Sequence, residues 1–322
     1  MPGEGLALRG DLDGTSEAFR DSTAAELTSK PAPAEARATV ISAAVRPDGP
    51  FSLRLSARLA GNATRTFADG VMVAALAAGG VGRAWQQPDG VVQLRAESDA
   101  ALEELRFVLA LDDDHSPFLK RFGRDPLLAQ ATRRLRGLRP IRLSTVTQAL
   151  LRAVCGQLIQ SGRARAIERS VIRAATPQLP RTRLHAPPDP AALGRFAPAE
   201  LRRLGLGMRR GTALVRLCRS IDLERLRALP TRAAAERLER ERGLGPWSVG
   251  VVCLEGLGRF ERGLVGDLGL VKLCSALRGR WVEPTETAEL LEPYGEWSGL
   301  ASVYLLAAFR LGLVPLPQHA AA

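Results

Sequence analysis

The stretch "RGLGPWS" (242–248) directly follows a charged run, "AAAERLERER" (233–242), that is rich in strong helix formers. Gly243 predicts the end of a helix over 232–242, because glycine takes the left-handed backbone conformation at low cost. Gly245 and Pro246 predict the start of a second helix over 246–256, since proline is tolerated in the first turn of a helix. Together they predict a helical hairpin with a four-residue turn, whose backbone N–H groups over 243–248 point outward.

The start of the second helix has a physical use beyond chain reversal. Unpaired N–H groups at a helix N-terminus can hold a phosphate without reading base sequence. An ordinary turn between two helices is the alternative interpretation. Nineteen residues after Ser248, the segment "GLVGDLGL" (263–270) places Asp267 among apolar residues and glycines. Asp267 opens a predicted helix over 266–278, where it is either a structural helix cap or a functional carboxylate.

The charge of the chain favours a polyanionic partner. The 322 residues carry a formal net charge of +11, and the isoelectric point is about 10.7. A GC-rich coding bias is the competing explanation, because only Lys30, Lys120 and Lys272 stand among the 45 basic residues. No apolar run is long enough for a membrane span, and the first residues do not resemble a secretory signal. We therefore expect a protein of the bacterial cytoplasm, associated with the nucleoid, and no membrane partner.

The cysteines and histidines do not have the spacing of metal ligands. The four cysteines, Cys155, Cys218, Cys253 and Cys274, are too far apart for a Cys-x-x-Cys site, and each lies in an apolar helical pattern. We expect buried free thiols, no iron–sulfur cluster and no metal held by side chains.

The sequence predicts two folded blocks between two tails. Residues 1–36 and 313–322 are predicted tails, the first of them disordered. Residues 37–114 are predicted as a small α+β domain, with β-prone runs over 38–45, 51–59, 64–76 and 82–97. Turns are predicted at 47–49 and 88–90, and a helix over 98–111 capped by Ser98 or Asp99.

Residues 115–312 are predicted as an α-helical domain. Asp125-Pro126 is expected to open one helix, and Thr145 with Gln148 to form a capping box ahead of another. Residues 175–197 contain five prolines and are expected to form a loop. Further helices are predicted over 162–174, 198–204, 208–220, 222–228, 232–242, 246–256, 266–278, 285–292 and 297–311.

The segments "LERERGLGPWSVGVVCLEGLGR" (238–259) and "VGDLGLVKL" (265–273) resemble the cassette of the helix-hairpin-helix DNA glycosylase superfamily. The upstream segment "LRPIRLSTVTQALLRAVCGQLIQSGRARAI" (138–167) is also similar to that superfamily. The chain resembles the AlkA-type DNA-3-methyladenine glycosylases in particular, over about residues 38–312. The resemblance implies a TBP-like antiparallel sheet with helices in the N-terminal domain, followed by an all-α helix-hairpin-helix glycosylase domain.

The resemblance also implies roles for individual residues. Asp267 matches the catalytic aspartate, which stabilises positive charge on the deoxyribose or orients the attacking water. The positions that match the base pocket are Trp247, Val251, Leu268 and Leu306. The positions that match DNA contacts are Gln157, Leu158, Gly243, Gly245, Ser248 and Lys272. Leu158 matches the wedge that fills the gap left by a flipped base, with a buried core leucine as the alternative. Lys272 is either a phosphate contact or a solvated helix residue.

No cofactor is expected, apart from a structural Na⁺ or K⁺ that family members hold through hairpin carbonyls. The matching carbonyls here are those of Glu239, Glu241 and Leu244. Bifunctional relatives carry a lysine nucleophile where this chain has Trp247, so a monofunctional enzyme is predicted. We expect a monomer that acts on double-stranded DNA with damaged bases.

The predicted activity is hydrolysis of the N-glycosidic bond of alkylated bases such as 3-methyladenine. Three pocket positions that are often aromatic in the family are Val251, Leu268 and Leu306 here, and Ser298 replaces a common arginine. A glycosylase for a different damaged base is therefore a second hypothesis. A non-catalytic protein that binds damaged DNA is a third, and a helical protein–protein module is the last.

Overall fold

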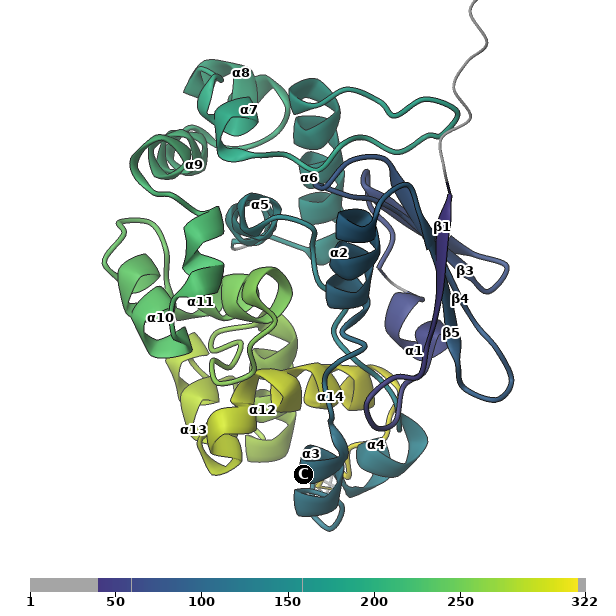
Figure 1. Ribbon diagram of the computed structural model, residues 1–322. Helices are drawn as coiled ribbons and strands as arrows, with labels where there is room; N and C mark the ends of the chain where they lie inside the picture. The colour runs from purple at the N-terminus through teal and green to yellow at the C-terminus, as the bar shows by residue number, and fades with distance from the viewer. Residues whose placement is uncertain (1–39, 59, 158, 318–322) are drawn as a thin grey trace, which may run out of the picture. The chain divides into compact units, whose positions relative to one another are not determined.

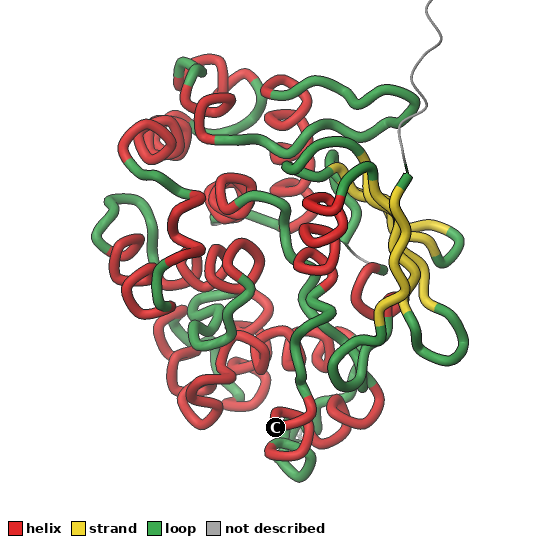
Figure 2. The backbone as a smooth tube through the Cα atoms, in the orientation of Figure 1, coloured by secondary structure: helices red, strands yellow, loops and turns green. Residues whose placement is uncertain are grey.

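The computed structural model describes residues 40–58, 60–157 and 159–317. The predicted tail 1–36 and the predicted wedge Leu158 lie outside the described residues. The described chain starts with a five-stranded sheet and continues mostly as helices (Figure 1; Figure 2). The strands are β1 Ile41–Val45, β2 Arg65–Ala68, β3 Val71–Ala75, β4 Val81–Gln86 and β5 Val92–Ala96.

The sheet is antiparallel throughout, with the order β1-β5-β4-β3-β2. Ala84 of β4 lies opposite Met72 on one side and Leu94 on the other, and all three are buried. Arg83 and Arg95, one residue along, are paired and exposed on the other face. This alternation is that of a sheet with one solvated face. Helix α2 (Asp99–Leu109), capped by Ser98 as predicted, packs against β1, β4 and β5.

The β-prone run predicted over 51–59 is wrong, because Leu53–Ala57 form helix α1. Its alternating residues resemble a strand, but Leu53 and Ala57 also stand four apart and bury one helical face together. Ser52 accepts a hydrogen bond from the Leu55 N–H group at the helix start. The Leu53 N–H group donates to Oε1 of Gln86, which ties the helix to β4.

The rest of the described chain is mostly helical. Its α-helices are α3 Ser116–Arg121, α4 Ala129–Arg134, α5 Val146–Gly156, α6 Ser161–Ala175, α7 Pro190–Gly194, α8 Pro198–Arg203, α9 Met208–Ser220, α10 Thr231–Glu239, α11 Pro246–Val251, α12 Leu268–Arg278, α13 Thr287–Leu291 and α14 Ser298–Arg310. Tighter or wider helical turns join some of them: η1 Glu224–Ala228, η2 Val252–Leu257, η3 Pro284–Glu286 and η4 Glu292–Trp297. Nearly every residue of α5 is buried. It packs against α6, α9, α11 and η2 and so forms the centre of this part.

Two local predictions of helix and loop need correction. The helix expected after Asp125-Pro126 begins only at Ala129, because the Asp125 carboxylate holds a turn through the N–H groups of Leu127 and Leu128. Residues 175–197 are not all loop, since they include α7, capped by Asp189.

The expected capping box at Thr145 is only half formed. Thr145 does accept from the Gln148 N–H group, but the Gln148 side chain donates instead to Thr64, between the sheet and α5. A buried amide that finds a long-range partner no longer reaches back to the helix start.

The apolar core continues past residue 312, since Leu313 and Val314 are buried with the helical cluster. All four cysteines are buried free thiols, as predicted. None of the helices described here combines the length and apolar character needed to cross a membrane. The division at residue 114 stays a prediction.

Candidate active site

The hairpin between α10 and α11 is built from backbone conformations that glycine and proline favour. α10 ends at Glu239, three residues earlier than predicted, and a turn over 240–245 leads to α11. Gly243 has φ of +97°, in the left-handed region. Gly245 is the extended N-cap of α11, and Pro246 occupies the first helical position. The predicted helical hairpin is therefore present, with a longer turn.

The N-terminus of α11 has no side-chain cap. Within the described ranges, the N–H groups of Gly243, Gly245, Trp247 and Ser248 have no acceptor. Gly245 is exposed, and a Cβ built on it would meet no atom within 4 Å. Exposed, unpaired amides at a helix start attract an anion.

Asp267 opens α12, and both of its carboxylate oxygens are held. Oδ1 accepts from the Gly269 N–H group at 2.8 Å, which is the predicted helix cap. Oδ2 accepts from the indole Nε1 of Trp247 at 3.0 Å. The carboxylate is half-buried. The two interpretations of Asp267 are therefore compatible, because one oxygen caps the helix while the other faces the hairpin.

Trp247 is fixed between α5 and α12. Its ring lies directly over Gly156 at the end of α5, where any Cβ would overlap Cη2 of the indole. The indole N–H then points at Asp267. Only glycine leaves room for the ring in this position. The predicted pocket aromatic is thus also the hydrogen-bond partner of the predicted catalytic carboxylate.

Gln157 contacts the hairpin rather than solvent. Its side-chain Nε2 donates to the Gly243 carbonyl at 2.8 Å and to Oγ of Ser248 at 3.0 Å. Ser248 is 2% exposed, so its hydroxyl belongs to this contact. Arg210 of α9 donates to the Gln157 carbonyl at 3.0 Å. The end of α5, from which Leu158 follows, is therefore tied to the hairpin and to α9.

The aliphatic residues of the predicted base pocket differ in exposure. Leu306 is half-buried and packs against Gly269, beside Asp267. Leu268 is 48% exposed, next in sequence to Asp267. Val251 is 5% exposed and belongs to the hydrophobic core. The structure therefore brings Trp247 and Leu306 close to Asp267, whereas Val251 serves packing within the helical core.

Lys272 is exposed on α12, beyond the first turn that follows Asp267. No ion pair of Lys272 is found in the described part of the chain. An exposed lysine here suits either the phosphate contact or the solvated residue predicted from the sequence.

The hairpin carbonyls offer the kind of ligand that Na⁺ or K⁺ takes. The Glu241 carbonyl accepts from the Leu244 N–H group at 3.1 Å, which leaves its second lone pair. No amide of the described residues donates to the carbonyls of Glu239 or Leu244. The three predicted carbonyls therefore keep lone pairs that could serve a monovalent cation, and the cation itself stays a prediction.

Charge at the hairpin is balanced by arginine. Hydrogen bonds from Arg216 and Arg237 lower the pKa of the Glu241 carboxyl group. Arg216 also donates to the Arg242 carbonyl at 2.9 Å. The Glu241 charge is thus compensated where an approaching phosphate would otherwise meet it.

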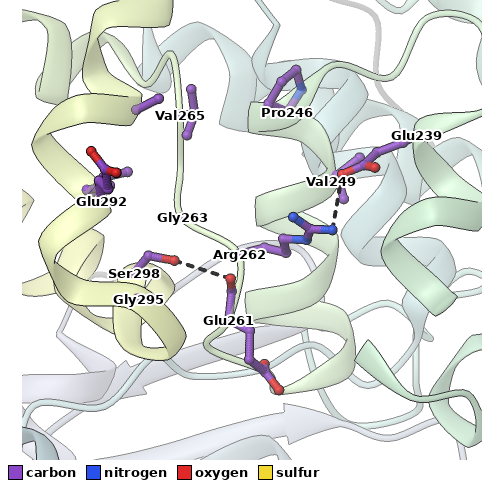
Figure 3. A pocket seen from close by; sticks show the side chains of 12 residues that line it. Glu239, Pro246, Val249, Glu261, Arg262, Gly263, Val265, Glu292, Gly295 and Ser298 are labelled. Carbon is purple, nitrogen blue, oxygen red and sulfur yellow. Dashed lines mark hydrogen bonds and ion pairs between the residues drawn. The ribbon is translucent and has the colours of Figure 1, made fainter. Parts of the chain in front are cut away.

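The segment that leads to Asp267 is held against α11 (Figure 3). Pro246 and Val249 of α11 face Gly263 and Val265 across a hollow, and neither Asp267 nor Trp247 lines it. Arg262 reaches Glu239 at 3.6 Å. A Cβ on Gly250 would lie 2.5 Å from the Gly263 carbonyl oxygen, so the two backbones are in close contact. This close packing fixes where α12 and its aspartate begin.

Comparison with known proteins agrees with this geometry. A curated DNA-3-methyladenine glycosylase of Bacillus subtilis (strain 168) is 27% identical over 205 residues, which cover 61% of this chain and 67% of that protein. A 3-methyladenine DNA-glycosylase from Archaeoglobus fulgidus superposes with a TM-score of 0.73 at 17% identity, over 83% of this chain and 98% of the other. The chain has the DNA glycosylase fold. The resemblance predicted from the sequence is confirmed.

A second solved structure widens the range of activities found on this fold. The 8-oxoguanine glycosylase/lyase of Clostridium acetobutylicum, in complex with double-stranded DNA, superposes with a TM-score of 0.70 at 18% identity, over 82% of this chain and 93% of the other. No family model matches the chain. The glycosylase fold by itself therefore does not select one damaged base.

Sequence reasoning missed two residues of the site, Gly156 and Gly269. Gly156 provides the space for the Trp247 ring, and Gly269 donates its N–H group to Asp267. The segments "CGQ" and "GDLGL" contained both glycines, and a glycine inside a helical pattern signals a close approach. The side chain that approaches Gly156 is that of Trp247, and the one that approaches Gly269 is that of Leu306. Both lie far away in the sequence, so the pattern does not identify them.

Proposed function

We propose that this protein is a monofunctional DNA glycosylase that removes alkylated bases from double-stranded DNA. The observation that carries the proposal is the pairing of Asp267 with Trp247 beside the uncapped N-terminus of α11. This arrangement supplies an anion-binding turn for a phosphate and a fixed carboxylate for the adjacent sugar. Similarity to the Bacillus subtilis DNA-3-methyladenine glycosylase supports the choice of an alkylated base.

The hairpin amides would hold a DNA phosphate next to the damaged nucleotide. Gly243, Gly245 and Ser248 contribute backbone N–H groups, which grip phosphate without reading sequence. A base in a duplex is stacked, so it must be flipped out, at a cost of a few kcal/mol. Leu158 is proposed as the apolar wedge that fills the gap, and the preceding residue, Gln157, is bonded to the hairpin.

Asp267 would act on the deoxyribose of the flipped nucleotide. As the N-glycosidic bond breaks, positive charge grows on the sugar ring, and a fixed carboxylate stabilises it electrostatically. Water then adds to the sugar carbon, and an alkylated base leaves readily because it is already cationic. Trp247 orients the carboxylate through its indole N–H group, and its ring supplies a face on which an electron-poor base can stack.

Hydrolysis, rather than strand cleavage through a Schiff base, is proposed because Trp247 occupies the lysine position of bifunctional relatives. A Na⁺ or K⁺, if bound, would be held by the carbonyls of Glu239, Glu241 and Leu244. Such an ion adds positive charge close to the phosphate.

A second lesion class is favoured by one specific observation. Leu306 places an aliphatic side chain against Gly269, close to Asp267. Trp247, which bonds Asp267, is the one aromatic residue among the four predicted pocket positions. Fewer aromatic faces give less stabilisation to a cationic base. A deaminated or oxidised base is the alternative substrate. A purely binding role is disfavoured, since a carboxylate facing DNA backbone repels it unless it serves the chemistry.

The decisive experiment compares the parent with Asp267→Asn on methylated duplex DNA. Asparagine keeps an oxygen for the Gly269 N–H group, but its amide N–H₂ faces the Trp247 donor and carries no charge. We expect release of 3-methyladenine and 7-methylguanine by the parent, and a loss of about 10²–10³-fold in the variant. Binding to an abasic-site duplex should not weaken. Borohydride should trap no covalent adduct with the parent.

The outcomes separate the proposals. Release of a deaminated or oxidised base alone would establish the alternative substrate. Tight binding with no base release from any damaged duplex would leave the binding role. Equal rates for the parent and Asp267→Asn would remove Asp267 from the mechanism.

A further inference from the structure

A basic groove lies on the helical part, separate from the Asp267 site. It runs between the segment that joins α7 to α8 and one side of α9. Among the described residues, Arg195, Arg216 and Arg219 line it and no carboxylate does; the other lining residues are Phe196, Ala197, Pro198, Thr212, Val215 and Ser220. Arg216 is already ion-paired with Glu241 at 2.6 Å, so the guanidinium groups of Arg195 and Arg219 are the main charges that make this groove a site for an anion.

Backbone carbonyls hold the arginines of this groove in place. Arg195 donates through one terminal nitrogen to the Ala175 carbonyl at 2.7 Å. Arg219 donates through Nε to the Gly194 carbonyl at 2.7 Å. Each guanidinium has five N–H donors, so most of them stay available. An arginine that is already oriented loses less side-chain entropy when it binds a ligand.

The groove is continuous with the hairpin along α9. Arg216 lines the groove and also donates to the Arg242 carbonyl in the hairpin turn. One turn earlier on α9, Ala213 lies close to Gly243 of the hairpin turn. A Cβ built on Gly243 would lie 3.3 Å from the Cβ of Ala213. From Ala213 to Arg219 the helix rises about 9 Å. That is about three nucleotide steps along one strand of a duplex.

We propose that this groove holds the sugar–phosphate backbone of the duplex at a short distance from the damaged nucleotide. The inference rests on the proposed glycosylase function, because it takes the hairpin as the place where the lesion strand is gripped. A phosphate backbone fits the observations better than an acidic peptide does. The groove lies within a few nucleotide steps of the hairpin, and oriented guanidinium groups bind phosphate through two N–H groups at once.

The test varies duplex length. Parent protein is titrated, over a series of salt concentrations, with duplexes of roughly 10 base pairs whose abasic site lies about two base pairs from one end or from the other. Each duplex is also tested after extension at that near end by about one turn. We expect the slope of the logarithm of the binding constant against the logarithm of the salt concentration to become steeper by about 2 for one of the two extensions. That extension identifies the flank that enters the groove.

Two kinds of variant then address the groove. Arg195→Gln with Arg219→Gln removes two charges, and glutamine at 219 keeps an N–H donor at the position of Nε for the Gly194 carbonyl. We expect about a tenfold loss of affinity for the extended duplex, none for the short one, and a salt dependence that no longer steepens. A matched control, Arg54→Gln with Arg83→Gln, makes the same change of charge at two exposed arginines of the sheet region.

Two single substitutions at Thr212 test the groove without removing the arginine contacts that could matter for folding. Thr212 is exposed in the groove and makes none of the carbonyl contacts. Thr212→Glu should weaken binding of the extended duplex several-fold by repelling phosphate, whereas Thr212→Gln, of equal size and no charge, should not.

Equal length dependence in the parent and in all of these variants would overturn the groove proposal. An equal loss of affinity for short and extended duplexes in the groove variants would also overturn it. So would binding of an acidic peptide in the groove combined with DNA affinity that does not depend on duplex length. The proposed function fails separately, if the parent releases no base from any damaged duplex. In that case length-dependent binding through the groove would still stand.

Discussion

The N-termini of α5 and α11 show the same physical property used in two ways. At α5, the Glu224 carboxylate accepts from the N–H groups of Val146 and Thr147 at 2.9 and 3.0 Å. At α11, no side chain caps the helix, and the N–H groups of Gly245 and Trp247 have no acceptor among the described residues. One helix start is neutralised from within the protein, while the other is exposed to solvent.

The difference shows where an external anion can bind. Every helix N-terminus carries partial positive charge and unpaired N–H groups. α5 begins in the interior, where unpaired donors are costly, so an internal carboxylate is required. α11 begins at the surface after Gly245, where solvent can satisfy the amides, and the proposed function places a phosphate there. The uncapped end is therefore the one suited to binding an anion.

The largest expected effect is on stability, at α5. Glu224→Ala removes the acceptor of two backbone N–H groups and of the Thr147 hydroxyl. We expect the free energy of unfolding to fall by about 3 kcal/mol, because buried donors lose their partner. Urea denaturation measures it, and DNA affinity of the folded protein should be unchanged.

Glu236→Ala is the control for this change, since Glu236 pairs with Arg232 on the surface of α10 and should contribute little. Equal stability of both variants would mean that the start of α5 does not depend on Glu224, and the contrast between the two helix starts would fail.

The next effect concerns the end of α5, which contacts the α11 hairpin. In Gly156→Ala the new methyl group overlaps the Trp247 ring, so the indole must move and lose its hydrogen bond to Asp267. We expect base excision to slow by about 30-fold, or about 2 kcal/mol, under single-turnover conditions. Affinity for an abasic-site duplex should change much less.

Gly162→Ala is the matched control, because a Cβ there meets no atom within 4 Å. An excision rate that stays at the parent level in Gly156→Ala would show that Trp247 does not position Asp267.

The smallest effect is expected at the uncapped helix start itself. Gly245 has φ of −96°, which alanine adopts readily, and a Cβ there meets no protein atom within 4 Å. Gly245→Ala should leave the free energy of unfolding unchanged but place a methyl group where a phosphate approaches. We expect duplex affinity to fall about tenfold, or about 1.4 kcal/mol, measured by fluorescence anisotropy.

Gly61→Ala provides the comparison at another exposed glycine, whose Cβ would also be nearly free of contacts. Equal duplex affinity for the two variants would argue that no phosphate binds over Gly245.

Local chemistry made much of this architecture predictable. Ser98, Thr145 and Asp267 act as helix caps at the positions predicted for them. The runs 38–45, 64–76 and 82–97 contain the strands because their alternation matches a sheet with one buried face. Residues 51–59 show the same alternation but contain α1, because contacts with Gln86 and the buried face of the sheet favoured a helix. Short apolar runs are ambiguous for this reason.

The roles of particular side chains were less predictable. Gln157 is predicted to contact DNA, which stays a prediction, and the structure adds that its amide bonds the hairpin. Val251 was expected to line the pocket and is part of the core. The partner of Gln157 lies 86 residues away in the sequence, so no local pattern identifies it.

Backbone preferences of glycine, proline and aspartate were enough to predict a turn at Gly243, the start of α11 at Pro246 and the cap at Asp267, although the turn spans 240–245. These preferences act within a few residues, so they can be read from the chain alone. Packing of the folded chain was needed to bring Trp247 to Asp267, to set its ring over Gly156, and to place Glu224 at the start of α5. These contacts join segments that are distant in sequence, so they depend on how whole helices pack and not on any local preference.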